Sequence, residues 1–477
     1  MNSFRALTMA TLLVLSAGCS DPLSTDLATP PIVTIATPVN DAGFTSGAVV
    51  SFTGMAQDHA GSQLTGPALV WASNRDGNLG SGGTISSTVL TTGEHKITLT
   101  ATDAAGSSAA AGVTITVTPP LIPSTITSGG NHTCALSSTG VAFCWGWNGH
   151  GQLGTGNSTS SSTPVPVAGG LKFTLLTAGE GHTCGRATSG ESYCWGDNEA
   201  GELGTASFAS SNVPALVHAT VQFTRLSAGG KYTCGLTASG SAYCWGQNTQ
   251  GRLGVGDLEH RRAPAAVAGG HSFKSIETGN SQQTCAVTTA SRGYCWGDNG
   301  FHQLGLGLPL TVSFSLSPLP VSTEVDFRTI HPGEWFSCGL STGGQAYCWG
   351  ANYGGRLGNS LIGVTQASPY KVIGDFSYSE ISVGRFHTCA RTNQVVYCWG
   401  QNTVGQLGDN STASRGSPRV VNGNHSFGSV SAGNSHNCAL TPAGAAYCWG
   451  ANGAGQLGDG TKIDRWEPRA AAAWPSP

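Results

Sequence analysis

Short stretches in which apolar and polar residues alternate, separated by Gly-rich turns, recur along most of the chain. In one example, residues 131–136 and 141–145 flank the tripeptide Ser138-Thr139-Gly140. A period of two indicates half-buried β-strands. A three-residue connection that ends in glycine is typical of a hairpin, because glycine adopts the left-handed conformation without strain. The pattern therefore predicts a chain built from antiparallel hairpins.

This hairpin recurs seven times at a nearly constant spacing. Each copy ends in Cys-Trp-Gly, and the first cysteines of successive copies are 49 to 53 residues apart. A fixed period of this size is the sequence signature of a solenoid or a propeller. Seven units of four short strands would close a ring. We therefore predict an all-β fold with a seven-bladed β-propeller over residues 126–477.

Departures from the repeat predict local differences between the units. The glycine that ends the hairpin turn is replaced by Ser291 in the fourth unit, where we expect a distorted turn. The sixth unit has a shorter spacing between its cysteines, which predicts a two-residue turn at Asn393-Gln394. Each unit also carries a Pro-x-x-Val-like strand after a variable loop, and the last copy lies at 467–470. We expect blades offset from the sequence unit, with the two chain ends sharing one blade.

The segment 32–118 contains neither a cysteine nor a copy of the repeat. Strand-like stretches separated by turn residues predict an antiparallel β-sandwich with Trp71 in its core. The expected strands are 31–35, 48–52, 68–71, 95–100 and 113–117. Asp58 and Asp103 are either turn caps, which we favour, or part of a calcium site. Residues 97–118 resemble bacterial immunoglobulin-like repeats, which implies an immunoglobulin-like spacer followed by a linker over 119–125.

Fourteen of the fifteen cysteines fall into seven pairs inside the repeats. Six pairs are Cys-x9-Cys and one is Cys-x8-Cys, unlike the Cys-x2-4-Cys knuckles of structural zinc sites. Directly opposed residues of a hairpin project to one face, so each pair is placed for a cross-strand disulfide. The expected bridges are Cys134–Cys144, Cys184–Cys194, Cys234–Cys244, Cys285–Cys295, Cys338–Cys348, Cys389–Cys398 and Cys438–Cys448.

The N-terminus predicts export. Arg5 precedes an apolar core, and small residues then lead to Cys19, so residues 1–18 are expected to be a signal peptide. The run Leu15-Ser16-Ala17-Gly18-Cys19 resembles a bacterial lipoprotein signal, which implies lipidation of Cys19 and a tether over 19–31. The alternative is an ordinary secretion signal in which Cys19 has no role. We expect a bacterial cell-envelope protein, lipid-anchored or secreted.

The repeats as a whole resemble those of the regulator-of-chromosome-condensation family. The motif Gly-Gln-Leu-Gly at 151–154, 405–408 and 455–458 carries this resemblance, together with Ala-Gly-x-x-His-Thr at 178–183. The resemblance covers about 350 residues and implies a seven-bladed propeller. Bulky residues alternate on both faces of each hairpin, so the seven tryptophans are expected to form the core between blades rather than a ligand cage.

Charge and motifs argue against several classes of function. The formal net charge is -3, so no global field favours nucleic acid, and no nucleic-acid partner is expected. We find no phosphate-binding loop and no hydrolase motif. The histidines before the first cysteines, at 132, 182, 387 and 436, recur by the repeat, so we interpret them as structural. We predict no enzyme activity, no metal and no cofactor.

The units differ most in the loop after Gly-x-Leu-Gly and in the turn before the first cysteine, and variable loops on a rigid scaffold are where binding usually resides. The candidate contacts there are Trp335, Phe336, Phe314, Arg261 and Arg262. Our leading hypothesis is a lipid-anchored envelope protein whose propeller binds a protein or a glycan. One alternative resembles another branch of the fold, the secreted β-lactamase inhibitory proteins, in which one propeller face blocks an enzyme. The other alternative is an envelope hydrolase or lyase.

Overall fold

The computed structural model describes residues 29–118, 122–280, 282–309 and 312–474. The signal peptide, Cys19 and most of the expected tether lie outside the described residues. The chain forms two compact units, residues 1–119 and 120–477, and each is described by itself. No helix among the described residues is long and apolar enough to cross a membrane.

The first unit is a sandwich of two sheets. One sheet has the order β1-β3-β4 with β7 also paired to β3, and the other has the order β2-β9-β8-β5-β6. The strands are β1 (Ile32–Thr37), β2 (Ala42–Thr45), β3 (Val50–Gln57), β4 (Gln63–Leu64), β5 (Leu69–Ser73), β6 (Gly77–Ser81), β7 (Thr84–Ser87), β8 (Gly93–Thr102) and β9 (Ser108–Thr118), with the short 3-10 helix η1 (Gly66–Ala68) before β5.

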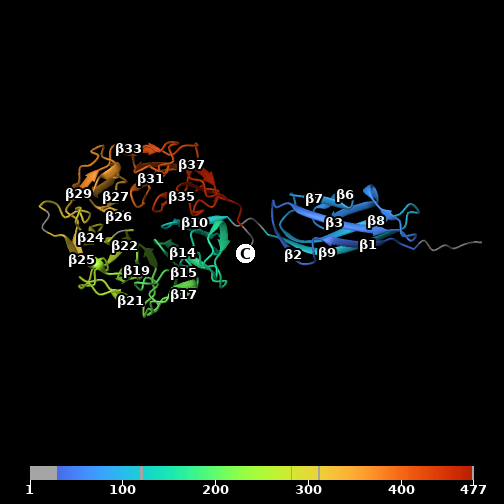
Figure 1. Ribbon diagram of the computed structural model, residues 1–477, viewed down its shortest axis with the longest axis horizontal. Coiled ribbons are helices and arrows are strands. Elements are labelled where there is room, and N and C mark those ends of the chain that lie inside the picture. The colour runs from blue at the N-terminus through green and yellow to red at the C-terminus, as the bar shows by residue number, and fades with distance from the viewer. Residues whose placement is uncertain (1–28, 119–121, 281, 310–311, 475–477) are drawn as a thin grey trace, which may run out of the picture. The chain divides into compact units, whose positions relative to one another are not determined.

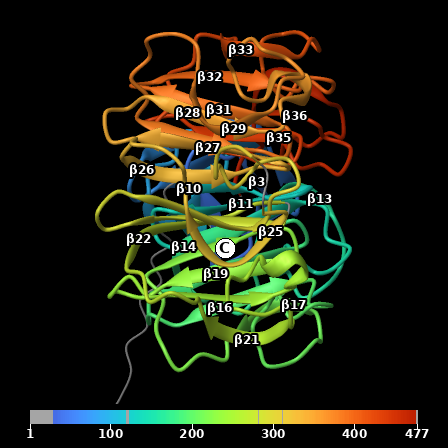
Figure 2. The same ribbon diagram turned by 90° about the vertical axis from the view of Figure 1, so that its left-hand side faces the viewer.

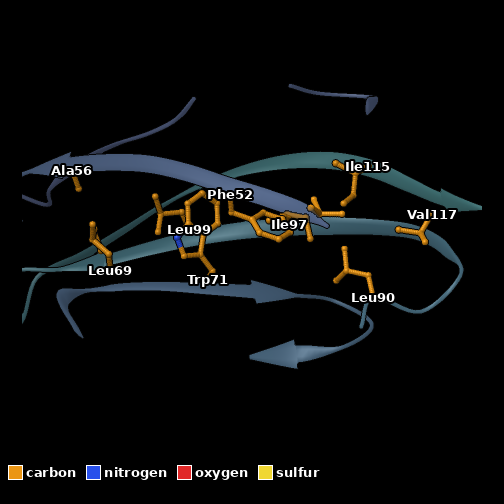
Figure 3. Close-up of a cluster of buried hydrophobic side chains, with 11 residues drawn as sticks. Phe52, Ala56, Leu69, Trp71, Leu90, Ile97, Leu99, Ile115 and Val117 are labelled. Atoms are coloured by element: carbon orange, nitrogen blue, oxygen red, sulfur yellow. The ribbon is translucent and has the colours of Figure 1, made fainter. Parts of the chain in front are cut away.

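Trp71 lies in the centre of the sandwich core, as the sequence predicts (Figure 3). Its indole Nε1 donates to Gly82 O at 2.9 Å, and its ring lies 5.6 Å from that of Phe52. Asp58 and Asp103 each accept backbone N–H groups within their own turns. The expectation of a wholly antiparallel sandwich is wrong at one edge, where β2 pairs with β9 in parallel.

The second unit contains seven four-stranded antiparallel sheets among its described residues. The first four blades are β10 (Pro123–Ser128), β11 (His132–Ser137), β12 (Ala142–Gly146) and β13 (Ser161–Pro166); β14 (Phe173–Ala178), β15 (His182–Ala187), β16 (Ser192–Gly196) and β17 (Ser211–Leu216); β18 (Arg225–Ala228), β19 (Tyr232–Leu236), β20 (Ala242–Gly246) and β21 (Arg261–Ala266); and β22 (Phe273–Thr278), β23 (Gln283–Thr288), β24 (Gly293–Asp298) and β25 (Phe314–Pro320).

The other three blades are β26 (Phe327–Pro332), β27 (Phe336–Ser341), β28 (Ala346–Gly350) and β29 (Gln366–Lys371); β30 (Glu380–Val383), β31 (His387–Thr392), β32 (Val395–Gly400) and β33 (Arg415–Val420); and β34 (Ser429–Ala432), β35 (His436–Leu440), β36 (Ala446–Gly450) and β37 (Arg465–Ala470). Short 3-10 helices η2 (Thr249–Gly251) and η3 (Tyr353–Gly355) follow the third strands of the third and fifth blades. The first strand of this unit begins at Pro123, three residues before the predicted start of the propeller.

The sheets are arranged as the blades of a propeller, with strands such as β17, β25 and β33 on the periphery (Figure 1). Seen from its edge, the ring has β33 and β21 at opposite ends (Figure 2). Neighbouring innermost strands are joined by small hydroxyl side chains. Thr127 Oγ1 accepts from Ala178 N at 3.2 Å, and Thr177 Oγ1 accepts from Ala228 N at 3.0 Å. The predicted all-β propeller is confirmed.

The hairpin turns follow the sequence prediction with one correction. Gly140 has a φ of +80°, as a three-residue turn requires, and Asn393-Gln394 forms the predicted two-residue turn. Ser291 does not distort its turn. It adopts the same left-handed conformation, with a φ of +68°, and its carbonyl accepts from Phe327 N at 2.8 Å as Gly140 O accepts from Phe173 N. The backbone contact to the next blade therefore fixes the turn even without glycine.

All seven expected disulfides are present in the structure, and each joins the second and third strands of one blade. Each disulfide packs in one cluster with a tryptophan of the following blade. At the first interface, the Cys134–Cys144 bridge and Trp195 belong to one buried cluster, and Trp195 Nε1 donates to Gln152 O at 2.9 Å. The tryptophans are thus the core between blades, as predicted.

The first and last blades meet through the same kind of interface. The Cys438–Cys448 bridge packs with Trp145, whose Nε1 donates to Gln456 O at 2.9 Å. The expectation that the chain ends share a blade is wrong, because every sheet consists of four consecutive strands. The Pro-x-x-Val strand pairs within its own unit, as Val165 opposite Cys144 shows. The chain supplies its own innermost strand at 123–128, so closure needs no exchange.

The repeated histidines connect neighbouring blades and are fully buried. His132 Nε2 lies 2.8 Å from Thr183 Oγ1, and that hydroxyl donates to Gln152 O at 2.9 Å. Because the threonine proton is used in this way, His132 must donate from Nε2, which leaves Nδ1 unprotonated. Burial lowers the pKa of His132 and His436 to about 3, and that of His182 and His387 to about 4.

Acidification is therefore expected to destabilise the propeller. A histidine with a pKa near 6.5 in the unfolded chain and near 4 in the folded chain contributes fully above pH 6.5 and loses that contribution as the pH falls. At pH 5 the loss is roughly 2 kcal/mol for each such histidine. We expect His182→Gln to reduce the pH dependence of the urea midpoint between pH 7 and pH 5. Equal dependence in both proteins would contradict this assignment.

Candidate functional site

The two ends of each blade differ in what they carry. Ser128 pairs with Thr133, and His132 pairs with Gly146, so the turn 129–131 and the loop after Gly146 lie at the same end. The turn 138–140 lies at the other end. We call the first end the mouth face and the second the hairpin face. The variable loops, which the sequence singles out for binding, therefore surround the mouth face.

A repeated asparagine holds each variable loop. Asn148 Oδ1 accepts from Leu153 N at 2.9 Å, and its Nδ2 donates to Asn157 O and Thr159 O, both at 3.0 Å. The equivalent residues are buried and make corresponding bonds, including Asn198, Asn402 and Asn452. The amide bonds to backbone atoms of the loop, so the same contacts form with different loop sequences. The loops can therefore vary while their attachment to the blade stays the same.

A pocket of about 400 Å³ lies on the mouth face, between the turns of the second to sixth blades. Its walls combine two acids, three cations, three amides and one aromatic ring. The lining residues are Glu180, Gly230, Lys231, Gln247, Arg252, Asn280, Gln282, Glu334, Trp335 and Arg385. In the first and seventh blades the corresponding turns contain only small or uncharged residues, Gly130, Asn131, Asn434 and Ser435. We call this site the mouth pocket.

Trp335 provides the aromatic wall of the mouth pocket. Its φ is +64°, an unfavourable value for a bulky residue, and none of the described residues at the equivalent place in the other turns shows a positive φ. Phe301 lies 5.2 Å and Phe386 lies 6.2 Å from its ring, and Tyr353 lies 6.2 Å from Phe301. These four rings form one aromatic cluster, the mouth aromatics, that continues outward from the pocket.

Charged side chains pack against the mouth aromatics. The buried Arg356 guanidinium lies 4.8 Å from the ring of Phe386 and 5.7 Å from that of Tyr353, and its Nη1 donates to Glu334 O at 2.9 Å. Burial lowers the pKa of Arg356 to about 10, so it remains a cation at neutral pH. Glu334 pairs with Arg385 across the pocket wall. Arg385, which lines the pocket, lies 5.1 Å from the ring of Phe386, so one cation of the pocket also packs against the cluster.

Three charged residues replace the glutamine of the repeat motif Gly-Gln-Leu-Gly. The seven equivalent residues are Gln152, Glu202, Arg252, Gln303, Arg356, Gln406 and Gln456. In the fourth blade, Gln303 Oε1 accepts from Phe301 N and its Nε2 donates to Asp298 Oδ2, both at 2.7 Å. A neutral amide thus finds partners within its own blade, whereas the second, third and fifth blades carry a charged residue, of which Arg252 lines the mouth pocket.

Glu202 is the departure that most clearly costs stability. Its Oε2 accepts from Ala200 N at 2.7 Å, but the buried Oε1 has no partner among the described residues. Burial, and secondarily the nearby carboxylate of Asp197, raises the pKa of Glu202 to about 7. The unfolded carboxyl has a pKa near 4.5, so the folded protein loses stability as the pH rises from 4.5 to 7.

We expect Glu202→Gln to stabilise the propeller by about 1–3 kcal/mol at pH 8, and by much less at pH 5, where Glu202 is protonated. The new amide would donate to Asp197 as Gln303 donates to Asp298. Urea unfolding at both pH values measures the difference. Glu199→Gln, at a largely exposed position, is the control and should change little. A stabilisation that is equal at pH 5 and pH 8 would exclude this account.

The structure places the contact residues predicted from the sequence in different parts of the propeller. Trp335 lines the mouth pocket, whereas Phe336 is fully buried under Arg356 and is unavailable to a partner, so that part of the prediction is wrong. Its side chain faces the blade interface because β27 alternates. Arg261 and Phe314 pair with Gly246 and Asp298, which places them at the mouth end of the outer strands, away from the pocket lining. Arg262, next to Arg261 on β21, lies 5.3 Å from the ring of Phe208 in the loop before β17.

Sequence reasoning missed the charged half of the site. Lys231, Arg252, Glu334 and Arg385 were not among the candidates. Each is visible as a charged residue at a repeat position that is small or neutral in most units. A position-by-position comparison of the seven units would have identified them. Among the residues that the structure describes, no three His, Cys, Asp or Glu side chains are grouped so that they could hold a metal ion.

Comparisons with known proteins agree with this architecture. A family model described as RCC1-like domain matches residues 178–475, and two models of the regulator of chromosome condensation (RCC1) repeat match 139–185 and 124–152. The probable E3 ubiquitin-protein ligase HERC6 of Homo sapiens is 27% identical over 111 residues, which are 23% of this chain and only 11% of that protein.

Solved structures show the same fold at low identity. Prp20p of Saccharomyces cerevisiae is 21% identical with a TM-score of 0.64, and the match covers 71% of this chain and 87% of that one. Human WBSCR16 is 21% identical with a TM-score of 0.61, covering 69% of this chain and 89% of that one. At this level of identity the likeness concerns the fold.

Proposed function

Because this chain belongs to the RCC1-like domain family, we propose that it is a non-enzymatic scaffold that binds a partner protein through the mouth face. The single observation that carries the proposal is the mouth pocket with its aromatic cluster. Rings with charged neighbours are typical of the residues that dominate protein interfaces. The aromatic and charged residues of the mouth face occupy positions at which most other repeats have small or neutral residues. The fold therefore does not require them.

The seven disulfides are consistent with an extracellular or envelope location, because such bridges persist in oxidising compartments. We propose that Cys19 is lipidated and anchors the chain to the envelope membrane, with residues 32–118 as an immunoglobulin-like spacer. The mass of Cys19-containing peptides from the mature protein tests this part. An acyl modification supports the anchor, and an unmodified Cys19 in the mature chain excludes it.

The role of the mouth face is tested with a matched pair of tyrosines in the fifth blade. Tyr353 belongs to the mouth aromatics and is 50% exposed, whereas Tyr370 lies on the outer strand β29 and is 46% exposed. The full-length chain serves as bait for proteins of its own envelope fraction. We expect Tyr353→Ala to weaken capture of the specific partner at least about tenfold, as for a central interface residue. Tyr370→Ala should leave capture unchanged.

The aromatic cluster on one face also favours a second candidate of the same class, an inhibitor that covers the active site of an envelope or secreted enzyme. The cluster and the variable loops lie at one end of the blades, as an inhibitory face requires. If the captured partner is an enzyme, its activity with and without the chain separates inhibition from simple binding. A partner captured equally by the Tyr353→Ala variant would exclude the mouth face in both cases.

A further inference from the structure

Arg252 brings a buried cation to the wall of the mouth pocket. It is only 4% exposed, and its Nε and Nη2 donate to the carbonyl and hydroxyl of Thr249. Its guanidinium lies 5.6 Å from the ring of Tyr232. Among the residues that the structure describes, no carboxylate forms an ion pair with it. Asp298 and Glu180 lie near enough for their charges to favour the cation, but neither forms an ion pair with it. A carboxylate that enters the pocket and contacts the guanidinium directly therefore gains a strong partner.

The fold does not require an arginine at this position. Four of the seven blades have glutamine there, and Gln303 makes its bonds within its own blade. The propeller therefore tolerates the neutral residue. The cation in the third blade is consequently best explained by what enters the pocket, since it contributes no ion pair to the blade that carries it.

The surroundings of Arg252 suit a carboxylate. The planar guanidinium matches a carboxylate with two parallel hydrogen bonds. Lys231 and the amides of Gln247, Asn280 and Gln282 add further donors to the same walls. Glu334 is already paired with Arg385, and Glu180 lines the same pocket, near enough for its charge to act on Arg252. These two acids would repel a doubly charged phosphate more strongly than a singly charged carboxylate, so the carboxylate is the better ligand.

We propose that the mouth pocket receives an Asp or Glu side chain from an exposed loop of the partner protein, with the carboxylate bound by Arg252. The inference rests on the proposed function and specifies the chemistry of the partner. A volume of about 400 Å³ accommodates one or two side chains rather than a folded element. Trp335 would pack against the loop that carries the acid.

The apolar surface next to the pocket favours a protein over an acidic glycan. The loop after η3 carries Leu361 and Ile362, both exposed, and its Gly363 N donates to the O of Asn352, the residue before Tyr353, at 2.9 Å. Asn352 fixes this loop by donating to Leu361 O at 2.6 Å. Sugar rings can stack on aromatic side chains, but they leave branched aliphatic groups in water. A peptide loop with apolar residues around an acid would cover both parts of the surface.

A display library of random 12-residue peptides, selected on the full-length chain, tests the proposal. We expect the selected peptides to share an acidic residue with apolar neighbours. Binding of a fluorescent copy should fall about 10- to 100-fold in Arg252→Gln, which restores the glutamine of the repeat, and equally when the peptide acid becomes an amide. The two changes together should cost little more than either alone, because they remove the same contact. Arg262→Gln on the outer strand is the control.

Each other outcome overturns the inference. Selected peptides without an acid, or unchanged binding in Arg252→Gln, would exclude a carboxylate on Arg252. A hexameric oligogalacturonate that binds through Arg252 when the peptides do not would assign the pocket to a glycan. If peptides depend on Tyr353 but not on Arg252, the proposed function stands and only this inference fails. If they depend on Tyr370 instead, both fail.

Discussion

A propeller refolded with all its cysteines reduced is expected to be unfolded at temperatures where the oxidised protein is stable. Each bridge closes a loop of nine or ten residues, which stabilises the fold by roughly 2–3 kcal/mol in the chain-entropy model. Seven such contributions exceed about 10 kcal/mol, comparable with the whole stability of an ordinary domain. Circular dichroism and urea unfolding with and without dithiothreitol measure the loss.

The first unit provides an internal control for this experiment. Residues 32–118 contain no cysteine, so their unfolding transition should be the same in both redox states. The bridges are fully buried, so the chain must be reduced while it is unfolded and then refolded with reductant present. An unchanged midpoint for the propeller would show that packing between blades suffices and that the bridges are dispensable.

Replacing Trp195 by alanine is expected to destabilise the propeller by about 3–5 kcal/mol. Trp195 is fully buried between two blades, in one cluster with the Cys134–Cys144 bridge, and its ring lies 5.7 Å from that of Phe173. The substitution would leave a cavity in an interface that cannot close, because both neighbouring blades are held in the ring. Urea unfolding followed by circular dichroism measures the change.

Trp466 is the matched control for this prediction. It lies on the outermost strand β37 and is 49% exposed, so Trp466→Ala should cost about 1 kcal/mol or less. Comparable losses in the two variants would show that the interface tryptophans are not the core of the ring. A large loss at Trp195 alone would support the alternation of disulfide and tryptophan as the repeated unit of stability.

Much of the propeller could be predicted from the sequence because one rule is repeated seven times. The spacing of Cys134 and Cys144 fixes the hairpin register, and the register places the cysteines on one face and Trp145 on the other. Where a prediction failed, contacts between segments far apart in the sequence determined the local structure. The turn at Ser291 is kept in shape by Phe327 of the next blade, and closure depends on where Pro123 begins a strand.

The functional site was less predictable because its residues come from five blades. Trp335 was a candidate because it lies in a variable turn, and it lines the mouth pocket. Phe336 has the same signal in sequence, but strand alternation turns it into the interface. Arg252 and Arg385 are 133 residues apart in sequence and share one pocket only because the ring closes. Only the folded chain shows that Arg385 forms an ion pair with Glu334 and that Arg252 forms none with a described residue.

The most direct test of the binding face is site-specific photo-crosslinking in intact cells. A benzophenone amino acid is placed at Tyr353 on the mouth face or at Val395, the first residue after the hairpin turn of the sixth blade, two positions of similar exposure. The account predicts that one partner protein is crosslinked from position 353 and not from position 395. Crosslinking of that partner from position 395 alone, or from both positions equally, would contradict it.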